Sequence, residues 1–370
     1  MRITGLDIMC CRLPQSPLQD GDLNGNVGAR ELEFLVYSIN TDVGTNASIF
    51  GFAGASARGS AELARSAFEP LLIGKDPLDR EQLWQEFRVA DRWWNHLPIY
   101  SYGPIDICLW LIAAEAAGVP LYKYIGANAD TVETYCSSLV LPSVEAYAEQ
   151  AASLQSEGFK AYKIHPPGKN LDEDIEIHRA VRTAVGDDFP LMSDPVAPYS
   201  FDQALRLGRE LERLNYLWFE EPLADENSAS LRKLTAALDI PVVGCEVLAK
   251  HPYSLSEYLA TNVVDVVRAD VSWSGGVTGV LKTAHLAESF GAKCELHSTI
   301  FHPLELVNLH LCAAISNNSF FELLAPTSQF DFGLSEPISI DAGIAKLPSK
   351  SGLGIDLDWS MIDDCTFKKV

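Results

Sequence analysis

From about residue 130 onward, short apolar runs alternate with segments of helical periodicity. In order, the runs are "ETYCSSLVL", "FKAYKIH", "FPLMSD", "YLWFEE", "IPVVGCE", "VVDVVRAD", "AKCELH" and "SFFELL". Segments such as "SFDQALRLGRELERLN" and "VTGVLKTAHLAESFG" separate them. Strands that alternate with helices form parallel sheets. Eight such units of similar length predict a closed (β/α)8 barrel of ~200 residues, and an open doubly wound sheet is the alternative.

The N-terminal region has a different pattern. Two strand-like stretches, "ITGLDIMCCRLP" and "LEFLVYSINTDVGTNASIFGFAG", precede helical segments between residues 60 and 125. This combination predicts an α+β unit ahead of the barrel. Between the two stretches lies the glycine-containing loop "DGDLNGNVGA" at residues 20–29. Such a loop is typical of either a lid over a site or a linker.

Ionisable residues stand at the C-terminal ends of strands two to eight of the predicted barrel. They are Lys163 with His165, then Asp194, Glu220, Glu246, Asp270, His297 and Glu322. From Asp194 onward the spacings are 26, 26, 24, 27 and 25 residues, so each repeat carries one such residue to the same face. That face is where (β/α)8 enzymes have their active sites.

Each of these residues taken singly has an ordinary explanation, since a carboxylate at a strand end often caps a helix or lies at the surface. The whole series is harder to explain in this way because buried charges are costly unless they are paired or bind a metal. Asp194, Glu220 and Glu246 end three consecutive strands, so their carboxylates can converge. Three oxygen ligands suit Mg²⁺, whereas zinc would favour His or Cys. Glu221 has the opposite strand parity and is expected to support the site from outside the ligand set.

Candidate acid–base groups flank the predicted metal site. Lys163 and His165 share one face of strand two because residues i and i+2 of a strand point to the same side. Asp270 and His297 end strands six and seven, nearly opposite on the ring. An aspartate that accepts a hydrogen bond from histidine fixes its tautomer and raises its basicity, so this pair predicts a dyad. Arg268 has the parity of Asp270 and is expected to point inward, to an ion pair or to a substrate.

Composition restricts the partners. The chain has 370 residues, 47% of them hydrophobic, and a formal net charge of -22, which disfavours nucleic acid and anionic membrane surfaces because both would repel it. No apolar stretch reaches the ~18 residues of a membrane span, and the N-terminus has a strand pattern rather than that of a signal peptide. Eight scattered cysteines lack metal-type CxxC spacing. A soluble, cytoplasmic protein with reduced cysteines is therefore expected.

The order of these residues along the chain resembles that of the mandelate racemase subgroup of the enolase superfamily. The order is Lys-x-His, Asp, "FEEP", Glu, Asp followed by "GGVTG", His and Glu. The similarity runs from "IDICLW" and "GVPLYKYIG" to the C-terminal "GLSEPISIDAGIAKLPSKSGLGIDLD". It implies an α+β capping domain at residues 1–126, a catalytic barrel at 127–328 and a segment at 329–370 that returns to the cap. A homo-oligomer is also expected. The muconate-lactonising subgroup is disfavoured because "VVRADVS" lacks its lysine on strand six.

The resemblance also implies roles for the site residues. The Mg²⁺ ligands of the family match Asp194, Glu220 and Glu246. Its Lys-x-Lys pair matches Lys163 and His165, and the dyad of the subgroup matches Asp270 and His297. Glu322 matches an acid that hydrogen-bonds the substrate carboxylate or enolate oxygen. The family removes a proton alpha to a carboxylate and forms an enediolate, which Mg²⁺ stabilises. We expect Lys163 and a protonated Glu322 to stabilise that intermediate as well.

Two departures from the family pattern leave the substrate open. His165 replaces a lysine, so it is open whether strand two supplies a base. Val196 replaces an asparagine that is frequent in the family and changes the pocket floor. The expected activity is dehydration of a sugar acid, a small hydroxy-carboxylate, to a 2-keto-3-deoxy acid, since only one face has a histidine with an aspartate partner. A racemase or epimerase of a 2-hydroxy acid is the alternative, and a non-catalytic binding protein on the same fold is a less favoured one.

Overall fold

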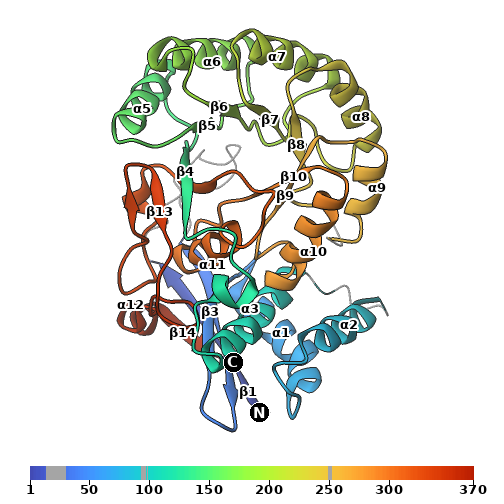
Figure 1. Ribbon diagram of the computed structural model, residues 1–370, viewed down its shortest axis with the longest axis vertical. Helices are drawn as coiled ribbons and strands as arrows, with labels where there is room; N and C mark the ends of the chain where they lie inside the picture. The colour runs from blue at the N-terminus through green and yellow to red at the C-terminus, as the bar shows by residue number, and fades with distance from the viewer. Residues whose placement is uncertain (14–30, 93–96, 98, 249–251) are drawn as a thin grey trace.

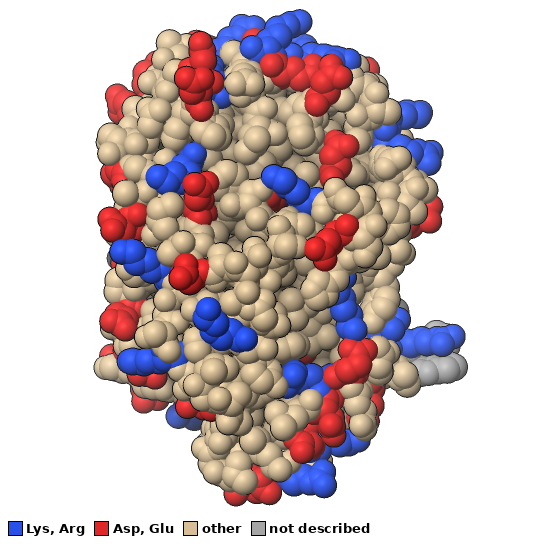
Figure 2. Space-filling model, viewed as in Figure 1, with Lys and Arg blue, Asp and Glu red and all other residues tan. Residues whose placement is uncertain are grey.

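The computed structural model describes residues 1–13, 31–92, 97, 99–248 and 252–370. The loop expected at residues 20–29 lies outside this range. The described chain forms a barrel of strands and helices above a smaller unit built of a sheet and helices (Figure 1). On the face shown in Figure 2, acidic and basic side chains are interspersed over both units. None of the helices in the described ranges is long and apolar enough to cross a membrane.

Eight strands form the barrel. They are β4 (Thr131–Ser137), β5 (Tyr162–Ile164), β6 (Leu191–Ser193), β7 (Trp218–Glu220), β8 (Val242–Gly244), β9 (Val266–Ala269), β10 (Lys293–Leu296) and β11 (Phe321–Leu324). Strands β4 to β10 pair in parallel in chain order, and β11 pairs with β4. The N–H of Cys294 in β10 donates to the carbonyl of Asn317, just before β11, at 2.9 Å. The predicted (β/α)8 barrel is therefore confirmed, and the open sheet is excluded.

Within the described part of the barrel, seven helices follow the strands, and helices cover its outside (Figure 1). They are α5 (Val144–Ser156), α6 (Leu171–Val185), α7 (Phe201–Arg213), α8 (Ser228–Ala237), α9 (Leu255–Ala260), α10 (Gly276–Ser289) and α11 (His302–Cys312). Helix α7 shows why such segments are helical. Its first turn is closed by a capping box between Ser200 and Gln203. Ala204, Leu207 and Leu211 follow at helical spacing and are buried, so one face packs inward.

Side chains of different chemistry fill the barrel interior in successive layers. An apolar cluster consists of Tyr135, Ala161, Met192, Trp218 and Val243. A layer of buried charges contains Lys163, Glu220, Arg268 and Glu322. Trp218 and Glu220 belong to the same strand and are two residues apart, so both point inward. The strand alternation that builds the apolar layer thus also directs the charged groups to the barrel axis.

In the residues that the structure describes, the smaller unit is an antiparallel sheet with four helices. Its strands are β1 (Ile3–Leu13), β2 (Leu32–Thr41), β3 (Ala47–Phe52) and β14 (Thr366–Lys369), in the order β14-β1-β2-β3. Its helices are α1 (Ala57–Leu72), α2 (Arg80–Ala90), α3 (Ile99–Ala116) and α4 (Leu121–Ile125). The second strand-like stretch of the sequence is two strands. A turn divides it, since Thr41 donates through its hydroxyl to the carbonyl of Thr45 at 2.9 Å and through its N–H to Asn46 at 2.8 Å.

The C-terminal segment touches both units. It contains a 3-10 helix (Thr327–Gln329), strands β12 (Ile340–Asp341) and β13 (Ile344–Lys346), and helix α12 (Trp359–Cys365) before β14. Strand β13 pairs with β4 of the barrel, and β14 pairs with β1. The two chain ends lie close together at the bottom of Figure 1. The domain boundaries at 126/127 and 328/329 stay predictions.

Helix α3 holds the start of α10 in place. Asp106 accepts hydrogen bonds from the backbone N–H of Thr278 at 2.8 Å and from its hydroxyl at 2.7 Å. Gly276 has φ +83°, and a Cβ there would lie 2.6 Å from Asp106 Oδ2. Glycine is therefore required at this position of the "GGVTG" motif. The contact fixes the loop between β9 and α10, which begins with Asp270.

Candidate active site

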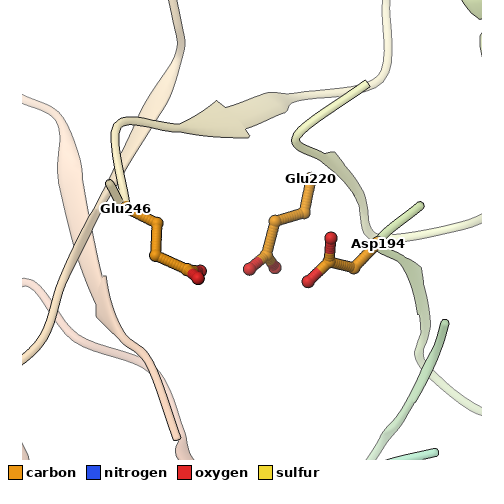
Figure 3. A group of neighbouring side chains, drawn as sticks. All are labelled: Asp194, Glu220 and Glu246. Carbon is orange, nitrogen blue, oxygen red and sulfur yellow. The ribbon is translucent and has the colours of Figure 1, made fainter. Parts of the chain in front are cut away.

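Three carboxylates meet at the mouth of the barrel. Asp194 directly follows β6, Glu220 ends β7 and Glu246 lies two residues beyond β8. One oxygen from each lies within 4.8 Å of the others, and all three residues are buried. Figure 3 shows their carboxylate groups directed toward a common region. The structure thus brings together the three residues that the sequence analysis assigned to a metal site, which we call the acidic triad.

The acidic triad has the chemistry of a site for a divalent cation. Burial raises the pKa of Glu246 to about 7, with His297 opposing the rise and Asp194 adding to it. Glu246 Oε2 has no hydrogen-bond partner within the described residues, although Arg268 Nε lies 3.8 Å away. Buried carboxylates this close together repel one another unless a cation lies between them. Because Mg²⁺ prefers a few carboxylate oxygens and leaves room for water, the residues fit that ion.

Two buried cations lie beside the acidic triad. The ammonium nitrogen of Lys163 is 3.0 Å from Asp194 Oδ2, 3.0 Å from Glu220 Oε1 and 2.9 Å from Glu322 Oε1. Arg268 Nε is 2.8 Å from Glu220 Oε1. Burial alone would lower the pKa of Lys163, but Glu220 and Glu322 outweigh it and hold the pKa well above its ordinary value. Lys163 is therefore placed as a buried positive charge that can stabilise an anion.

His165 lies next to Asp194. Its Nε2 is 3.1 Å from Asp194 Oδ2, and its Nδ1 is 2.6 Å from the carbonyl oxygen of Ser138. A carbonyl oxygen only accepts hydrogen bonds, so Nδ1 carries the proton in this contact. Burial would raise the pKa of Asp194, but Lys163 and His165 hold it well below its ordinary value. Nε2 is thus the nitrogen of His165 that is left for proton exchange.

His297 and Asp270 lie together on the other side of the site. His297 Nδ1 is 3.2 Å from Asp270 Oδ2, and Asp270 Oδ1 accepts the N–H groups of Ser272 at 2.6 Å and Trp273 at 3.1 Å. The Trp273 and His297 rings stack with centroids 4.6 Å apart. Burial would lower the pKa of His297, but Glu246 and Asp270 raise it to about 9. With Nδ1 held by Asp270, Nε2 faces the acidic triad, 3.3 Å from Glu246 Oε1.

Glu322 lies among hydrogen-bond donors and two buried cations. Its carboxylate accepts hydrogen bonds from the hydroxyl of Ser137 and from the N–H of Ser298, the latter at 3.1 Å. It also contacts Lys163 and Arg268. Burial would raise the pKa of Glu322, but the two cations outweigh burial and hold the pKa well below its ordinary value. These contacts favour the carboxylate form of Glu322, which can anchor both cations, and the expected protonated form stays a prediction.

A cavity of about 360 Å³ adjoins these groups. His165, Asp194, Glu246, His297 and Glu322 line it. Among the other lining residues, Trp273 and Glu221 were not expected there from the sequence. Trp273 gave no signal because it lies in the loop after β9. Glu221 was assigned to the opposite face, but its φ of 38° turns the chain after Glu220 so that Glu221 also lines the cavity. The inward direction of Arg268 was expected, and the structure places it in ion pairs.

The affinity for Mg²⁺ is expected to rise as the pH increases from about 6 to 8. Glu246, with a pKa of about 7, is protonated below that value, and the cation binds only the carboxylate form. Isothermal titration calorimetry in two buffers of different ionisation enthalpy should therefore detect proton release near pH 7. Asp188→Asn, which removes an exposed carboxylate in the turn before β6, serves as the control and should keep this behaviour. An affinity that is constant between pH 6 and 8 would contradict the expectation.

Fold and site together define the class of protein. It is a (β/α)8-barrel enzyme whose ionisable side chains gather at the C-terminal ends of the strands, with an N-terminal antiparallel sheet as a cap. Residues 146–361 match the family model described as enolase C-terminal domain-like. The chain belongs to this family, and its similarity to the mandelate racemase-like members of the enolase superfamily is confirmed.

Several known proteins are similar over most of their length. The chain is 28% identical over 326 residues to an arabinonate dehydratase from Saccharolobus solfataricus, spanning 85% of this chain and 87% of that protein. It is 30% identical over 310 residues to an L-talarate/galactarate dehydratase from Salmonella typhimurium, spanning 80% and 75%. The crystal structure of a D-glucarate dehydratase from Agrobacterium tumefaciens complexed with magnesium matches with a TM-score of 0.89 and 31% identity over 100% of both chains.

Proposed function

We propose that the protein is a Mg²⁺-dependent hydro-lyase that removes water from a sugar acid and releases a 2-keto-3-deoxy acid. The position of His297 carries the proposal. Its Nδ1 is held by Asp270 at 3.2 Å, and its Nε2 faces the acidic triad, 3.3 Å from Glu246. Dehydration needs a group that exchanges protons next to a charge-stabilising site. The similarity to three proteins named as dehydratases supports this activity.

Asp194, Glu220 and Glu246 would hold the Mg²⁺ ion. When bound, the ion would supply positive charge to the substrate carboxylate as the proton alpha to it is lost. Lys163 adds a second positive charge from the barrel interior, where the low dielectric strengthens its effect. Glu322 keeps the lysine in place through the 2.9 Å ion pair. The magnesium in the similar D-glucarate dehydratase supports the choice of ion.

The proton transfers follow from the two histidines. In its neutral form, Nε2 of His297 or of His165 takes the proton from C2 of the substrate. The electron pair of the C2–H bond then forms a C2=C3 double bond while the C3–O bond breaks. His297 donates a proton to the departing hydroxyl, which leaves as water. The enol that remains takes up a proton at C3 and becomes the 2-keto-3-deoxy acid.

His165 favours a second candidate function, epimerisation at C2. It belongs to the β5 side of the site and His297 to the β10 side, so the two could act on opposite faces of C2. However, Nδ1 of His165 contacts the neutral carbonyl of Ser138, whereas Nδ1 of His297 contacts a carboxylate. The two bases are therefore unequal, which suits dehydration better than inversion in both directions. A non-catalytic protein would gain nothing from the costly buried charges around Lys163.

Turnover in deuterated water separates the two activities. With Mg²⁺ and a panel of sugar acids, we expect a 2-keto-3-deoxy acid that carries deuterium at C3, since that position is protonated from solvent. Proton NMR and mass spectrometry of the products check this. A product with inverted C2, deuterium at C2 and no keto acid would establish the epimerase instead. The same incubation with excess chelator is the control and should yield neither product.

A further inference from the structure

We propose that Glu305 and Asn308 of helix α11 are positioning residues that hold the imidazole of His297 in place for proton transfer. The inference rests on the proposed function, in which His297 exchanges protons with the substrate. It concerns residues 297–299, which follow β10 and lead to α11, and the two helix side chains that bind them. We call residues 297–299 the histidine segment.

One oxygen of Glu305 binds two consecutive residues of the histidine segment. Glu305 Oε1 accepts hydrogen bonds from the hydroxyl of Ser298 at 2.9 Å and from the hydroxyl of Thr299 at 3.0 Å. It also accepts the backbone N–H of Thr299. All three residues are buried, Glu305 with an exposed fraction of 3%. Because buried donors that lose their acceptor stay out of reach of water, these bonds are costly to break, and Glu305 fixes the segment.

Asn308 holds His297 itself. Its side-chain amide donates to the backbone carbonyl of His297 at 2.8 Å, and its exposed fraction is 1%. The backbone N–H of His297 donates to the carbonyl of Ala269 in β9 at 2.9 Å. Glu305 and Asn308 are three residues apart on α11, a spacing that places them on the same face of a helix. That face therefore binds all three residues of the histidine segment.

The histidine segment carries two polar groups of the active site. His297 Nε2 lies 3.3 Å from Glu246 Oε1 of the acidic triad, and the N–H of Ser298 donates to Glu322 at 3.1 Å. His297, Ser298 and Thr299 all line the active-site cavity. A displacement of the segment would therefore move the imidazole relative to the triad and to a bound substrate. Misplacement of a reacting group by ~1 Å can lower a rate about 10²-fold.

Glu305 acts in this arrangement by accepting hydrogen bonds. Burial raises the pKa of Glu305 to about 8, and Asp270 adds to the rise, so the neutral form is favoured. Glutamine resembles that form in shape and keeps the acceptor oxygen, whereas methionine has a similar length and offers only a weakly accepting sulfur. Glu305→Gln should therefore keep the histidine segment in place, and Glu305→Met should release it.

The kinetics of matched variants test the proposal. We expect Glu305→Met and Asn308→Leu to lower kcat by roughly 10- to 100-fold, with KM and Mg²⁺ affinity changed less than about threefold, because both residues act through His297. Glu305→Gln should keep kcat within about threefold of the wild type. Asn317→Leu is the control for lost hydrogen bonds. Its amide donates to two backbone carbonyls just before β11, at the end of the barrel opposite the active site, so kcat should stay at the wild-type value.

Hydrogen exchange gives a readout that does not depend on turnover. In Glu305→Met and Asn308→Leu, mass spectrometry should show faster amide exchange in the peptide that covers residues 297–301 than in the wild type. Glu305→Gln and Asn317→Leu should leave that exchange unchanged. Thermal unfolding is measured for each variant, and if Glu305→Met does not fold, Asn308→Leu decides.

The outcomes are distinguishable. Wild-type kcat in a folded Glu305→Met or Asn308→Leu overturns the role of that residue, and so does a rise in KM with kcat unchanged. Equal losses of kcat in Glu305→Gln and Glu305→Met overturn the assignment to hydrogen-bond acceptance. Failure of the proposed function has a separate signature, since the wild-type protein would then release no keto acid while the exchange measurement still reports whether α11 holds the histidine segment.

Discussion

Glu246→Gln is expected to lower kcat/KM by at least about 10³-fold, because loss of one of three ligands removes several kcal/mol of charge stabilisation by the cation. The substitution keeps the volume of the side chain and removes its charge. It also removes the buried charge whose burial, with the repulsion from Asp194, raises the pKa of Glu246, so the melting temperature in chelator should not fall. Turnover, calorimetric Mg²⁺ binding and thermal unfolding with and without chelator measure these effects.

Glu246 is a better choice for this test than Glu220. Glu220 contacts Lys163 at 3.0 Å and Arg268 at 2.8 Å, so Glu220→Gln would leave two buried cations short of a partner. Breaking a buried ion pair in this way costs about 3–5 kcal/mol of stability and would confuse loss of metal with loss of fold. Asp188→Asn is the matched control for a change of one charge. Wild-type turnover that survives dialysis against excess chelator would refute the metal requirement.

His297→Asn is expected to lower turnover by about 10²- to 10⁴-fold, the usual contribution of a general acid–base group. Asparagine retains a polar side chain but cannot exchange protons near neutral pH. Exchange of the C2 proton with deuterated solvent, followed by NMR, shows whether the first proton transfer is lost as well. His285→Asn, at an exposed position of α10, is the control and should turn over at the wild-type rate.

Asp270→Asn completes the test of the dyad. Asp270 raises the pKa of His297, so its removal lowers that pKa. Whether His297 acts as base or acid, the limb of the pH–rate profile that reports its ionisation should move to lower pH. Turnover should also fall, though less than in His297→Asn. Near wild-type rates with an unchanged profile would assign the pair a structural role only.

Much of the candidate site could be predicted from local regularities. The apolar runs identify the strands, and the period of two identifies which residues point inward, as for Trp218 and Glu220 on β7. Parallel strands that follow one another in the chain have their C-terminal ends at the same face. Asp194, Glu220 and Glu246 were for this reason expected to meet, and the structure places them within 4.8 Å.

Other features could not be predicted because they depend on groups far apart in the chain. Glu322 is 54 residues from Arg268, and its contacts with Lys163 and Arg268 favour its carboxylate form against the effect of burial. The direction of Glu221 depends on one backbone angle, φ 38°, that strand parity does not anticipate. The stacking of Trp273 on His297 joins two loops that follow different strands.

The sequence by itself determined the barrel, the order of its strands and the set of ionisable residues at their ends, because hydrophobic periodicity and repeat spacing are local properties of the chain. Only the tertiary structure decided which of those groups lie beside an opposite charge and which nitrogen of each histidine faces the triad. Ionisation depends on burial and on neighbours within a few ångströms. Those neighbours, such as Lys163 beside Glu322 at 2.9 Å, are set by closure of the barrel and not by adjacency in the chain.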